Sequence, residues 1–309
     1  MVVEFNLLKK ILKNILLCYC DKKYTNMKSL KEYIAEGLLD RVKNKEVNHE
    51  ILIEEFLKEN YEIRGPYAIK TTDKGFVVDV RGGDIEVKNE NITSLTNGLF
   101  RFGDDCGFWC SDCNSLKSLE GAPIKCREFY CANCDNLTSL KGAPKEVKLG
   151  FNCQGCKSLK TLEGAPEKVG GMFNCSDCNS LKSLEGAPKE VWYFKCSNCN
   201  SLKSLEGTPK EVGWSFDCSE SHSLRTLEGA PEKVKGDFDC SDCKSLKTLE
   251  GAPKRVDRYF YCRGCKLLKS LEGAPKEVDA IYCSDCGVQF TEEDVKKHTN
   301  IKERIFMEL

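Results

Sequence analysis

The sequence predicts an α/β fold: a solenoid of short repeats, each with one strand and an irregular, extended return segment. Nineteen of the 21 cysteines lie between Cys106 and Cys286, and the first cysteine of each unit recurs every 21 or 22 residues. Eight of the nine prolines occupy one column of the same repeat. A fixed period of this length indicates stacked units that each pack on their neighbours. The lead cysteines are Cys110, Cys131, Cys153, Cys175, Cys196, Cys218, Cys240, Cys262 and Cys283.

A small α+β cap is expected ahead of the repeats, over residues 27–83. Apolar side chains recur at helical spacing in residues 28–45 and 47–60, which predicts two amphipathic helices. The segments Tyr67–Thr71 and Phe76–Val80 flank a short glycine-containing turn, and this pattern predicts a β-hairpin. We expect the cap to cover the first coil, because an open solenoid end exposes its core.

The repeats span residues 84–286, and each combines a short strand with a turn. In Phe194-Lys195-Cys196 the side chains alternate, so that Phe194 and Cys196 face a core and Lys195 faces solvent. Cys199 and Leu202 then return inward. The stretch Leu-Glu-Gly-Ala-Pro-Lys-Glu-Val follows, with a turn-forming glycine and a proline that fixes φ. It is too short for a helix, and we expect an extended, polyproline-like convex side.

Residues 287–309 are expected to form a C-terminal helical cap. Thr291 is followed three residues later by Asp294, which matches a helix-capping box. Val295 is the apolar residue that such a short helix would bury against the last coil. The repeats would then be covered at both ends.

The pattern Phe-x-Cys-x-x-Cys-x-x-Leu, carried for instance by Phe194, Cys196, Cys199 and Leu202, resembles the frame of leucine-rich repeats. Phenylalanine and cysteine stand where that frame has its two strand leucines, and a second cysteine takes its Asn/Cys position. The resemblance covers residues 84–286 and is to the short, cysteine-containing repeats of bacterial and bacteriophage proteins. It implies a parallel sheet on the concave side and a polar ladder that closes the turn after each strand.

The composition argues against several functional classes. The chain has 47 Lys and Arg against 48 Asp and Glu, so its net charge is close to zero. We therefore expect no basic surface of the kind that binds nucleic acids or anionic membranes. The chain has three histidines and no serine-hydrolase, phosphate-loop or HExxH motif. We therefore expect no enzyme activity, no catalytic residue and no cofactor. The expected partner is a protein, with no nucleic acid and no membrane, and the chain is expected to be a monomer.

The cysteines permit two interpretations. The spacing Cys110-x2-Cys113-x17-Cys131-x2-Cys134 is typical of four-cysteine zinc sites, so a zinc-binding structural protein is the alternative function. The favoured interpretation has no metal: the first cysteine of each repeat is a buried apolar residue, and the second donates its S–H to a backbone carbonyl. Ser221 replaces one second cysteine, and serine keeps such a hydrogen bond but binds zinc poorly. An odd cysteine count without a secretion signal indicates free thiols in a reducing compartment, the cytoplasm.

The outward strand positions define the candidate binding surface. It is predicted to be aromatic at both ends and acidic in the middle and toward the C-terminal half. Tyr and Trp among polar neighbours are typical of protein-binding surfaces, although aromatic residues also favour strands for their own sake. The predicted protein-binding residues are Trp109, Tyr130, Tyr193, Asp217, Asp237, Asp239, Tyr259, Tyr261 and Tyr282.

The segment Met27–Glu36 reads MKSLKEYIAE and resembles the capsid-targeting peptides of internal head proteins in tailed phages, which begin Met-Lys and end Ile-Ala-Glu. The resemblance implies that a prohead protease cleaves between Glu36 and Gly37 and that the protein resides inside the virion. It also implies that residues 1–26 are a mis-annotated leader. The competing explanation is an ordinary amphipathic helix with a capping box.

Overall fold

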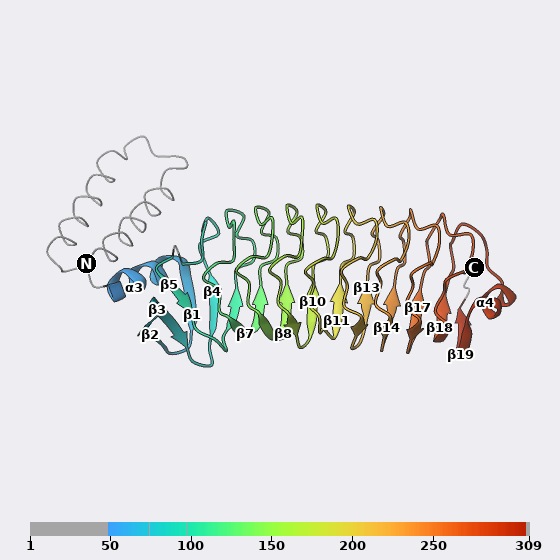
Figure 1. The fold of residues 1–309 in the computed structure, drawn as a ribbon. Coiled ribbons are helices and arrows are strands. Elements are labelled where there is room, and N and C mark those ends of the chain that lie inside the picture. Colours follow the sequence, from blue (N-terminus) through green and yellow to red (C-terminus); the bar gives the residue numbers. More distant parts are fainter. Residues whose placement is uncertain (1–48, 74, 97, 307–309) are drawn as a thin grey trace, which may run out of the picture.

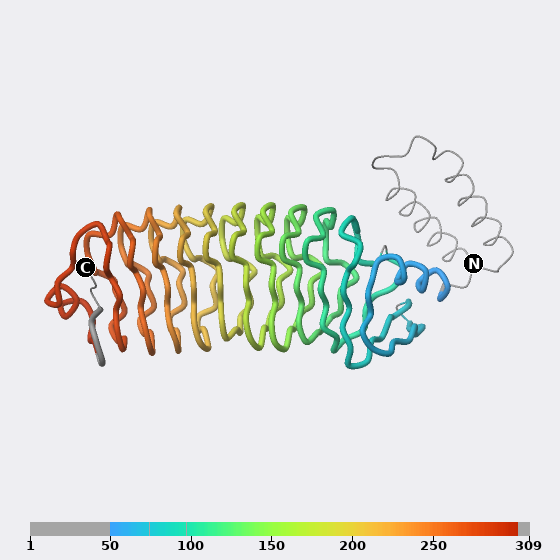
Figure 2. The backbone as a smooth tube through the Cα atoms, turned by 180° about the vertical axis from the view of Figure 1, so that it is seen from behind, coloured from blue at the N-terminus to red at the C-terminus, as the bar shows by residue number. Residues whose placement is uncertain are grey.

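The computed structural model is an elongated solenoid of stacked coils with a cap at each end (Figure 1). It describes residues 49–306 apart from 74 and 97, and of residues 49 and 302–306 it describes the backbone alone. The predicted helix over residues 28–45 and the Met27–Glu36 peptide lie outside the described residues. Seen from the front and from behind, the coils follow one another in a nearly straight line across the picture (Figures 1 and 2).

Each repeat contributes one strand to a parallel β-sheet, which confirms the predicted solenoid. Residues of the same column lie opposite each other: Phe194 is opposite Phe216, and Phe238 is opposite Phe260. The strands are β6 (Gly107–Trp109), β7 (Lys125–Tyr130), β8 (Glu146–Asn152), β10 (Met172–Asn174), β11 (Tyr193–Lys195), β13 (Phe216–Asp217), β15 (Phe238–Asp239), β17 (Tyr259–Tyr261) and β18 (Glu277–Tyr282).

A column of phenylalanines forms the centre of the core. Phe194 and Cys196 are fully buried and Lys195 between them is exposed, as strand alternation predicts. The ring centroid of Phe194 lies 5.3 Å from those of both Phe173 and Phe216. Because each ring contacts the rings before and after it, the coils are coupled through one continuous aromatic stack. The column consists of Phe108, Phe129, Phe151, Phe173, Phe194, Phe216, Phe238 and Phe260.

The residue before the second cysteine of each repeat turns the chain in the left-handed region. Its φ lies between +52° and +71° in all nine repeats. Asp, Asn and Gly tolerate this conformation better than other residues, and eight of the nine positions carry one of them. Glu220 is the exception, in the repeat where Ser221 follows. The two-residue spacing between the cysteines is therefore the length of a tight turn, independent of any ligand.

The extended stretch on the convex side also pairs. Its valine column forms a second row of short parallel strands, with Val234 opposite both Val212 and Val256. Parallel strands lie about 4.8 Å apart, so both sides of a coil are spaced by the same interaction and neither side is longer. Where the second row is paired, neighbouring coils are therefore joined by backbone hydrogen bonds on both sides. The strands of the row are β9 (Lys168–Val169), β12 (Glu211–Val212), β14 (Lys233–Val234) and β16 (Arg255–Val256).

The glycine turn that precedes this row packs directly on the previous coil. Gly186 has a φ of +89°, and a Cβ added to it would lie 2.8 Å from the backbone of Leu162. No side chain fits in that space, which explains why this column is glycine in the eight repeats that contain the turn.

In its described part, the N-terminal cap consists of a helix, two strands that join the main sheet and a separate three-stranded sheet. The hairpin predicted over residues 67–80 is present, and its strands pair antiparallel. Ile53 and Leu57 on the helix are buried against the first coil. Two further strands extend the sheets beyond what the sequence predicted, namely β1 and β5. The elements are α3 (His49–Asn60), β1 (Tyr61–Arg64), β2 (Tyr67–Thr72), β3 (Gly75–Val80), β4 (Asp84–Val87) and β5 (Phe100–Phe102).

The C-terminal cap is a helix followed by a strand. Helix α4 (Glu292–His298) begins with the predicted Thr291–Asp294 capping box and buries Val295. The helix ends where Thr299 adopts an extended conformation, with a φ of −142°. The following strand, β19 (Asn300–Phe306), pairs parallel to β18, so the cap is not helical throughout residues 287–309. The strand covers an edge of the sheet that would otherwise leave its backbone groups unpaired.

Substitutions at two adjacent residues test the strand register. Phe194→Ala is expected to lower the free energy of unfolding by about 3–5 kcal/mol, because it removes a fully buried ring shared by two coil interfaces. Lys195→Ala is the matched control: its ammonium lies 3.8 Å from the Asp217 carboxylate in an exposed pair, and its loss is expected to cost less than about 1 kcal/mol. Urea denaturation measures both, and similar losses would contradict the register.

Candidate interaction surface

The outward side chains of the main sheet form one continuous surface, which we call the sheet face. Its column nearest the turn runs in register through nine strands, from Trp109 to Tyr282. All nine residues predicted to bind protein lie on this face and are partly or fully exposed. The column is Trp109, Tyr130, Asn152, Asn174, Lys195, Asp217, Asp239, Tyr261 and Tyr282.

Trp109 and Tyr130 form a separate pair near the N-terminal end. Their rings are parallel to within 4°, with centroids 5.9 Å apart. The indole lies flat over Gly107, where an added Cβ would come within 2.2 Å of it. The pair is therefore held in place by its own strand and presents one broad aromatic surface.

The other seven predicted residues gather in the C-terminal half of the face. Tyr261 and Tyr282 stack with centroids 4.5 Å apart, and Tyr259 meets both of them edge-on at 6.1 and 5.9 Å. We call these three residues the tyrosine cluster. Burial and the nearby carboxylates of Asp237 and Asp239 raise the pKa of Tyr261 to about 12, so its phenol remains a neutral hydrogen-bond donor.

Carboxylates border the tyrosine cluster. Asp217 and Asp239 lie opposite each other on adjacent strands. Burial and the neighbouring charge of Asp217 raise the pKa of Asp239, although hydrogen bonds from Ser241 act in the opposite direction. One oxygen of Asp237, Oδ1, is buried and has no hydrogen-bond partner within the described part of the chain. Each of the three carboxylates has a cation of the chain near it: Lys195 lies 3.8 Å from Asp217, Arg258 lies 4.0 Å from Asp237, and Arg263 acts electrostatically on Asp239.

Two residues that the sequence analysis missed complete this region. The guanidinium of Arg258 lies over the ring of Tyr259, 4.9 Å from its centroid, and over that of Trp214 at 5.7 Å. The Nε atom of Arg258 is also 4.0 Å from Oδ1 of Asp237. Trp214 in turn lies 6.3 Å from Tyr193. Both residues occupy the short bend between the valine and phenylalanine columns, where repeats differ by one residue and alternation cannot assign a direction.

The thiols form a regular ladder through the core. The second cysteine of a repeat donates its S–H to the carbonyl of the first cysteine one repeat earlier, with sulfur–oxygen distances of 3.1–3.3 Å. Ser221 makes the equivalent bond to the carbonyl of Cys196 at 3.3 Å. The metal-free interpretation of the sequence predicts these hydrogen bonds from the second cysteine to a backbone carbonyl. Among the described residues, no group of three or more His, Cys, Asp or Glu side chains is arranged to hold a metal ion.

Burial raises the pKa of several of these thiols, whereas hydrogen bonds with Cys134 and Cys262 lower the pKa of Cys156 and Cys286. Burial raises the pKa of Cys106, Cys113 and Cys283 to about 12, and that of Cys110 and Cys240 further still. The buried side chains and their S–H···O=C contacts make the ladder a packing and hydrogen-bonding element of the core.

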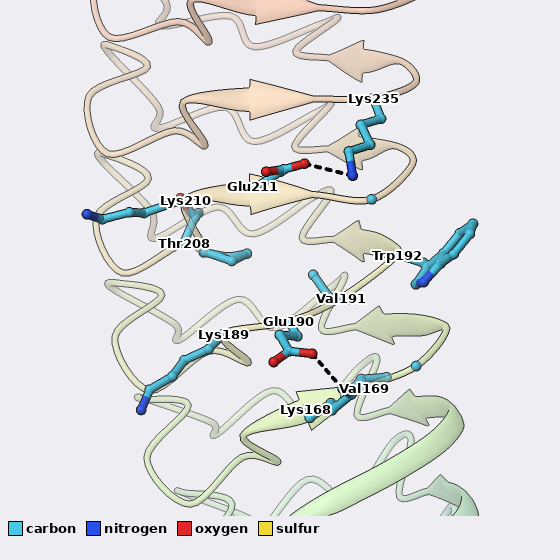
Figure 3. A pocket seen from close by; sticks show the side chains of 13 residues that line it. Lys168, Val169, Lys189, Glu190, Val191, Trp192, Thr208, Lys210, Glu211 and Lys235 are labelled. Atoms are coloured by element: carbon cyan, nitrogen blue, oxygen red, sulfur yellow. Dashed lines mark ion pairs between the residues drawn. The ribbon is translucent and has the colours of Figure 1, made fainter.

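An open groove of about 740 Å³ interrupts the second strand row on the convex side (Figure 3). Within the described chain, no backbone hydrogen bond joins Lys189 to Lys210, although the equivalent bond is present on both sides of this step. Two ion pairs line the groove, Lys168–Glu190 at 2.7 Å and Glu211–Lys235 at 2.8 Å. Lys189 and Lys210 point away from it. The groove presents few converging polar groups, so the sheet face is the stronger candidate.

Comparison with known proteins adds little to this geometry. No family model matches the chain, and no curated protein matches it. Among solved structures, it is similar to a leucine-rich repeat protein from Bacteroides ovatus, with 12% identity and a TM-score of 0.27, over 80% of this chain and 98% of that one. The strand register itself defines the class: the chain is a parallel β-solenoid with short repeats. In the part of the chain described, no helix is long and apolar enough to cross a membrane.

Substitution of one ladder cysteine tests the role of the thiols. The S–H of Cys265 is fully buried and donates to the carbonyl of Cys240 at 3.2 Å. Cys265→Ala is expected to lower the free energy of unfolding by about 1–3 kcal/mol, because it leaves that carbonyl without a donor. Cys265→Ser is expected to cost less, since Ser221 already fills the equivalent position. Thermal or urea denaturation measures both; a larger loss for serine would contradict the hydrogen-bonding role.

Alkaline pH is expected to destabilise the fold. An unfolded thiol ionises near pH 8.5, whereas burial raises the pKa of the folded Cys106, Cys113 and Cys283 thiols to about 12. Stability is therefore fully present below about pH 8.5 and falls above it, by about 1.4 kcal/mol per pH unit for each such thiol. Urea denaturation under reducing conditions from pH 7 to 11 measures the slope. Cys113→Ser should reduce the proton release on unfolding by about one; a flat profile would contradict the burial of the thiols.

Proposed function

We propose that the protein is a non-enzymatic protein-binding module and that the sheet face is its binding surface. The observation that carries the proposal is the register of this face. Nine strands align their outward residues into one surface with an aromatic pair at one end and an aromatic, acidic cluster at the other.

The physical character of the face supports this role. Aromatic side chains supply large contact areas at a small cost in conformational entropy, and they are enriched at the centres of protein interfaces. Here their rings are already ordered by stacking, so binding would immobilise few side chains. The carboxylates between them would add electrostatic selectivity for a basic partner.

The alternative function is that of a zinc-binding structural protein. The cysteine spacing favours it, but the S–H groups are directed at backbone carbonyls and the turn between paired cysteines is explained by its left-handed residue. Metal analysis of the purified protein separates the two functions: stoichiometric zinc together with unfolding on chelation would favour the structural one. The free thiols also fit our proposal of a reducing location, the cytoplasm.

The binding surface can be tested with two double variants, one on the sheet face and one on the opposite side of the solenoid. The double variant Tyr193→Ala with Tyr261→Ala is expected to abolish retention of the partner in affinity purification from native host cells. It removes two accessible aromatic side chains, one in the middle of the sheet face and one in the tyrosine cluster. Lys182→Ala with Lys203→Ala, on the convex side, is expected to leave retention unchanged. A partner held equally by both double variants would show that binding uses a different surface.

A phage origin and a place inside the virion form the finer part of the proposal. They rest on the Met27–Glu36 peptide alone, which lies outside the described residues. A capsid-targeting peptide would dock on an assembling scaffold, and its removal after assembly would leave the solenoid within the shell. The mature chain would then begin at Gly37.

N-terminal sequencing of protein recovered from virus particles tests this processing. The expected first residue is Gly37, and Glu36→Gln is expected to block cleavage without changing the thermal stability of the repeats, which begin many residues later. A chain that begins at Met1 or Met27, or absence of the protein from particles, would leave only the amphipathic-helix explanation.

A further inference from the structure

The last coil opens one position of the thiol ladder to solvent. Among the described residues, Cys286 is the one cysteine that is not buried. The second cysteine of the earlier repeats is fully buried, as Cys265 is, and a leucine three residues later, such as Leu268, returns to the core. In the last repeat that position is Gln289, which is exposed. The accessibility of Cys286 is therefore a consequence of where the repeat pattern ends.

The sulfur of Cys286 lies against a second thiol. Its S–H donates to the carbonyl of Cys262 at 3.2 Å, so the sulfur is held beside the backbone of that residue. When Cys286 loses its proton, the thiol of Cys262 donates a hydrogen bond to the sulfur that results. Cys262 itself is fully buried. A partly exposed thiol is thus in direct contact with a protected one, which is the arrangement from which an intramolecular disulfide forms.

The surroundings of Cys286 favour its thiolate. The hydrogen bond with Cys262 lowers the pKa of Cys286, and the ammonium of Lys266 acts in the same direction, whereas partial burial and the carboxylate of Asp285 oppose them. The thiolate is the form of cysteine that attacks a peroxide. Access and ionisation therefore coincide at this position of the ladder.

The earlier coils contain the same contact without the access. Cys265 donates to the carbonyl of Cys240 at 3.2 Å, yet both residues are fully buried. Cys156 has its pKa lowered by a hydrogen bond with Cys134, but it too is fully buried. These pairs are internal controls, because they share the chemistry of the last pair and differ from it in exposure.

We propose that Cys286 is a site of reversible oxidation by hydrogen peroxide and that Cys262 is its resolving cysteine. The Cys286 thiolate attacks one peroxide oxygen, the O–O bond breaks, and the leaving hydroxide takes up a proton to become water while the sulfur becomes a sulfenic acid. The sulfur of Cys262 then attacks the sulfenic sulfur, the S–O bond breaks, and the hydroxide leaves as water with the Cys262 proton. Two thiols and one peroxide thus give one disulfide and two waters, and a thiol reductant reverses the change.

Peptide mapping of the full-length protein tests the disulfide directly. The folded, reduced protein is treated with hydrogen peroxide, its remaining thiols are blocked with N-ethylmaleimide in denaturant, and tryptic peptides are identified by mass spectrometry. The expected product joins the peptide Tyr259–Arg263, which contains Cys262, to the peptide Glu277–Lys296. Fragment ions are expected to place the bond at Cys286, and dithiothreitol is expected to remove it. A bond to Cys283, the other cysteine of that peptide, would overturn the proposal.

Matched serine variants separate the two roles. Cys262→Ser is expected to leave the sulfenic acid of Cys286 unresolved, so that dimedone labels Cys286 in this variant at least about tenfold more than in the unchanged protein. Cys265→Ser removes a buried thiol from the same coil and is expected to leave the disulfide and the low dimedone labelling unchanged. Cys286→Ser is expected to eliminate both products. Equal labelling of the first two variants would contradict the role of Cys262.

The rate of oxidation tests the importance of access. In the unchanged protein, Cys286 is expected to be oxidised at least about tenfold faster than Cys156 and Cys265, which share its contacts but are fully buried. Cys18 and Cys20 lie in a separate tryptic peptide, so their reactions do not affect the comparison. Equal rates at the buried cysteines, or no oxidation of Cys286 in protein whose circular dichroism shows it to be folded, would overturn the proposal. The measurement needs no binding partner, so its result is independent of the proposed function.

Discussion

The residue-by-residue pairing of parallel strands is the constraint on which the rest of the structure depends. Because Phe194 lies opposite Phe216 and the next coil follows the same rule, a column in the sequence is also a column in space. The phenylalanine stack, the thiol ladder and the left-handed turn are all consequences of that identity. A residue that suits its column in one coil meets the same surroundings in the next, so small favourable terms accumulate along the molecule.

This identity explains what the sequence could predict. Alternation around Phe194 placed the core, and the deviation at Ser221 indicated a hydrogen bond in place of a metal ligand. The hairpin over residues 67–80 followed from local pattern and turn chemistry. Each of these depends on residues close together in the sequence, or on a repeat that brings distant residues into equivalent positions.

The parts that the sequence did not predict lie where local pattern carries no information. Strand β19 follows a helix in a short polar segment, and its conformation is stabilised by the free edge of β18. Arg258 and Trp214 stand in the bend where repeats differ in length, so neither alternation nor period sets their direction. The nine residues predicted to bind protein all lie on the sheet face, whereas Arg258 was missed because its contact with Trp214 joins bends two repeats apart.

The regular spacing of the strands fixes the distance between residues of one column. Trp109 and Tyr261 share one column, and at about 4.8 Å per strand they stand roughly 34 Å apart. Duplication or deletion of a whole internal coil would change that separation by one fixed increment and leave both ends intact. The number of coils between the two aromatic ends therefore sets the distance that a partner must span to contact both ends at once.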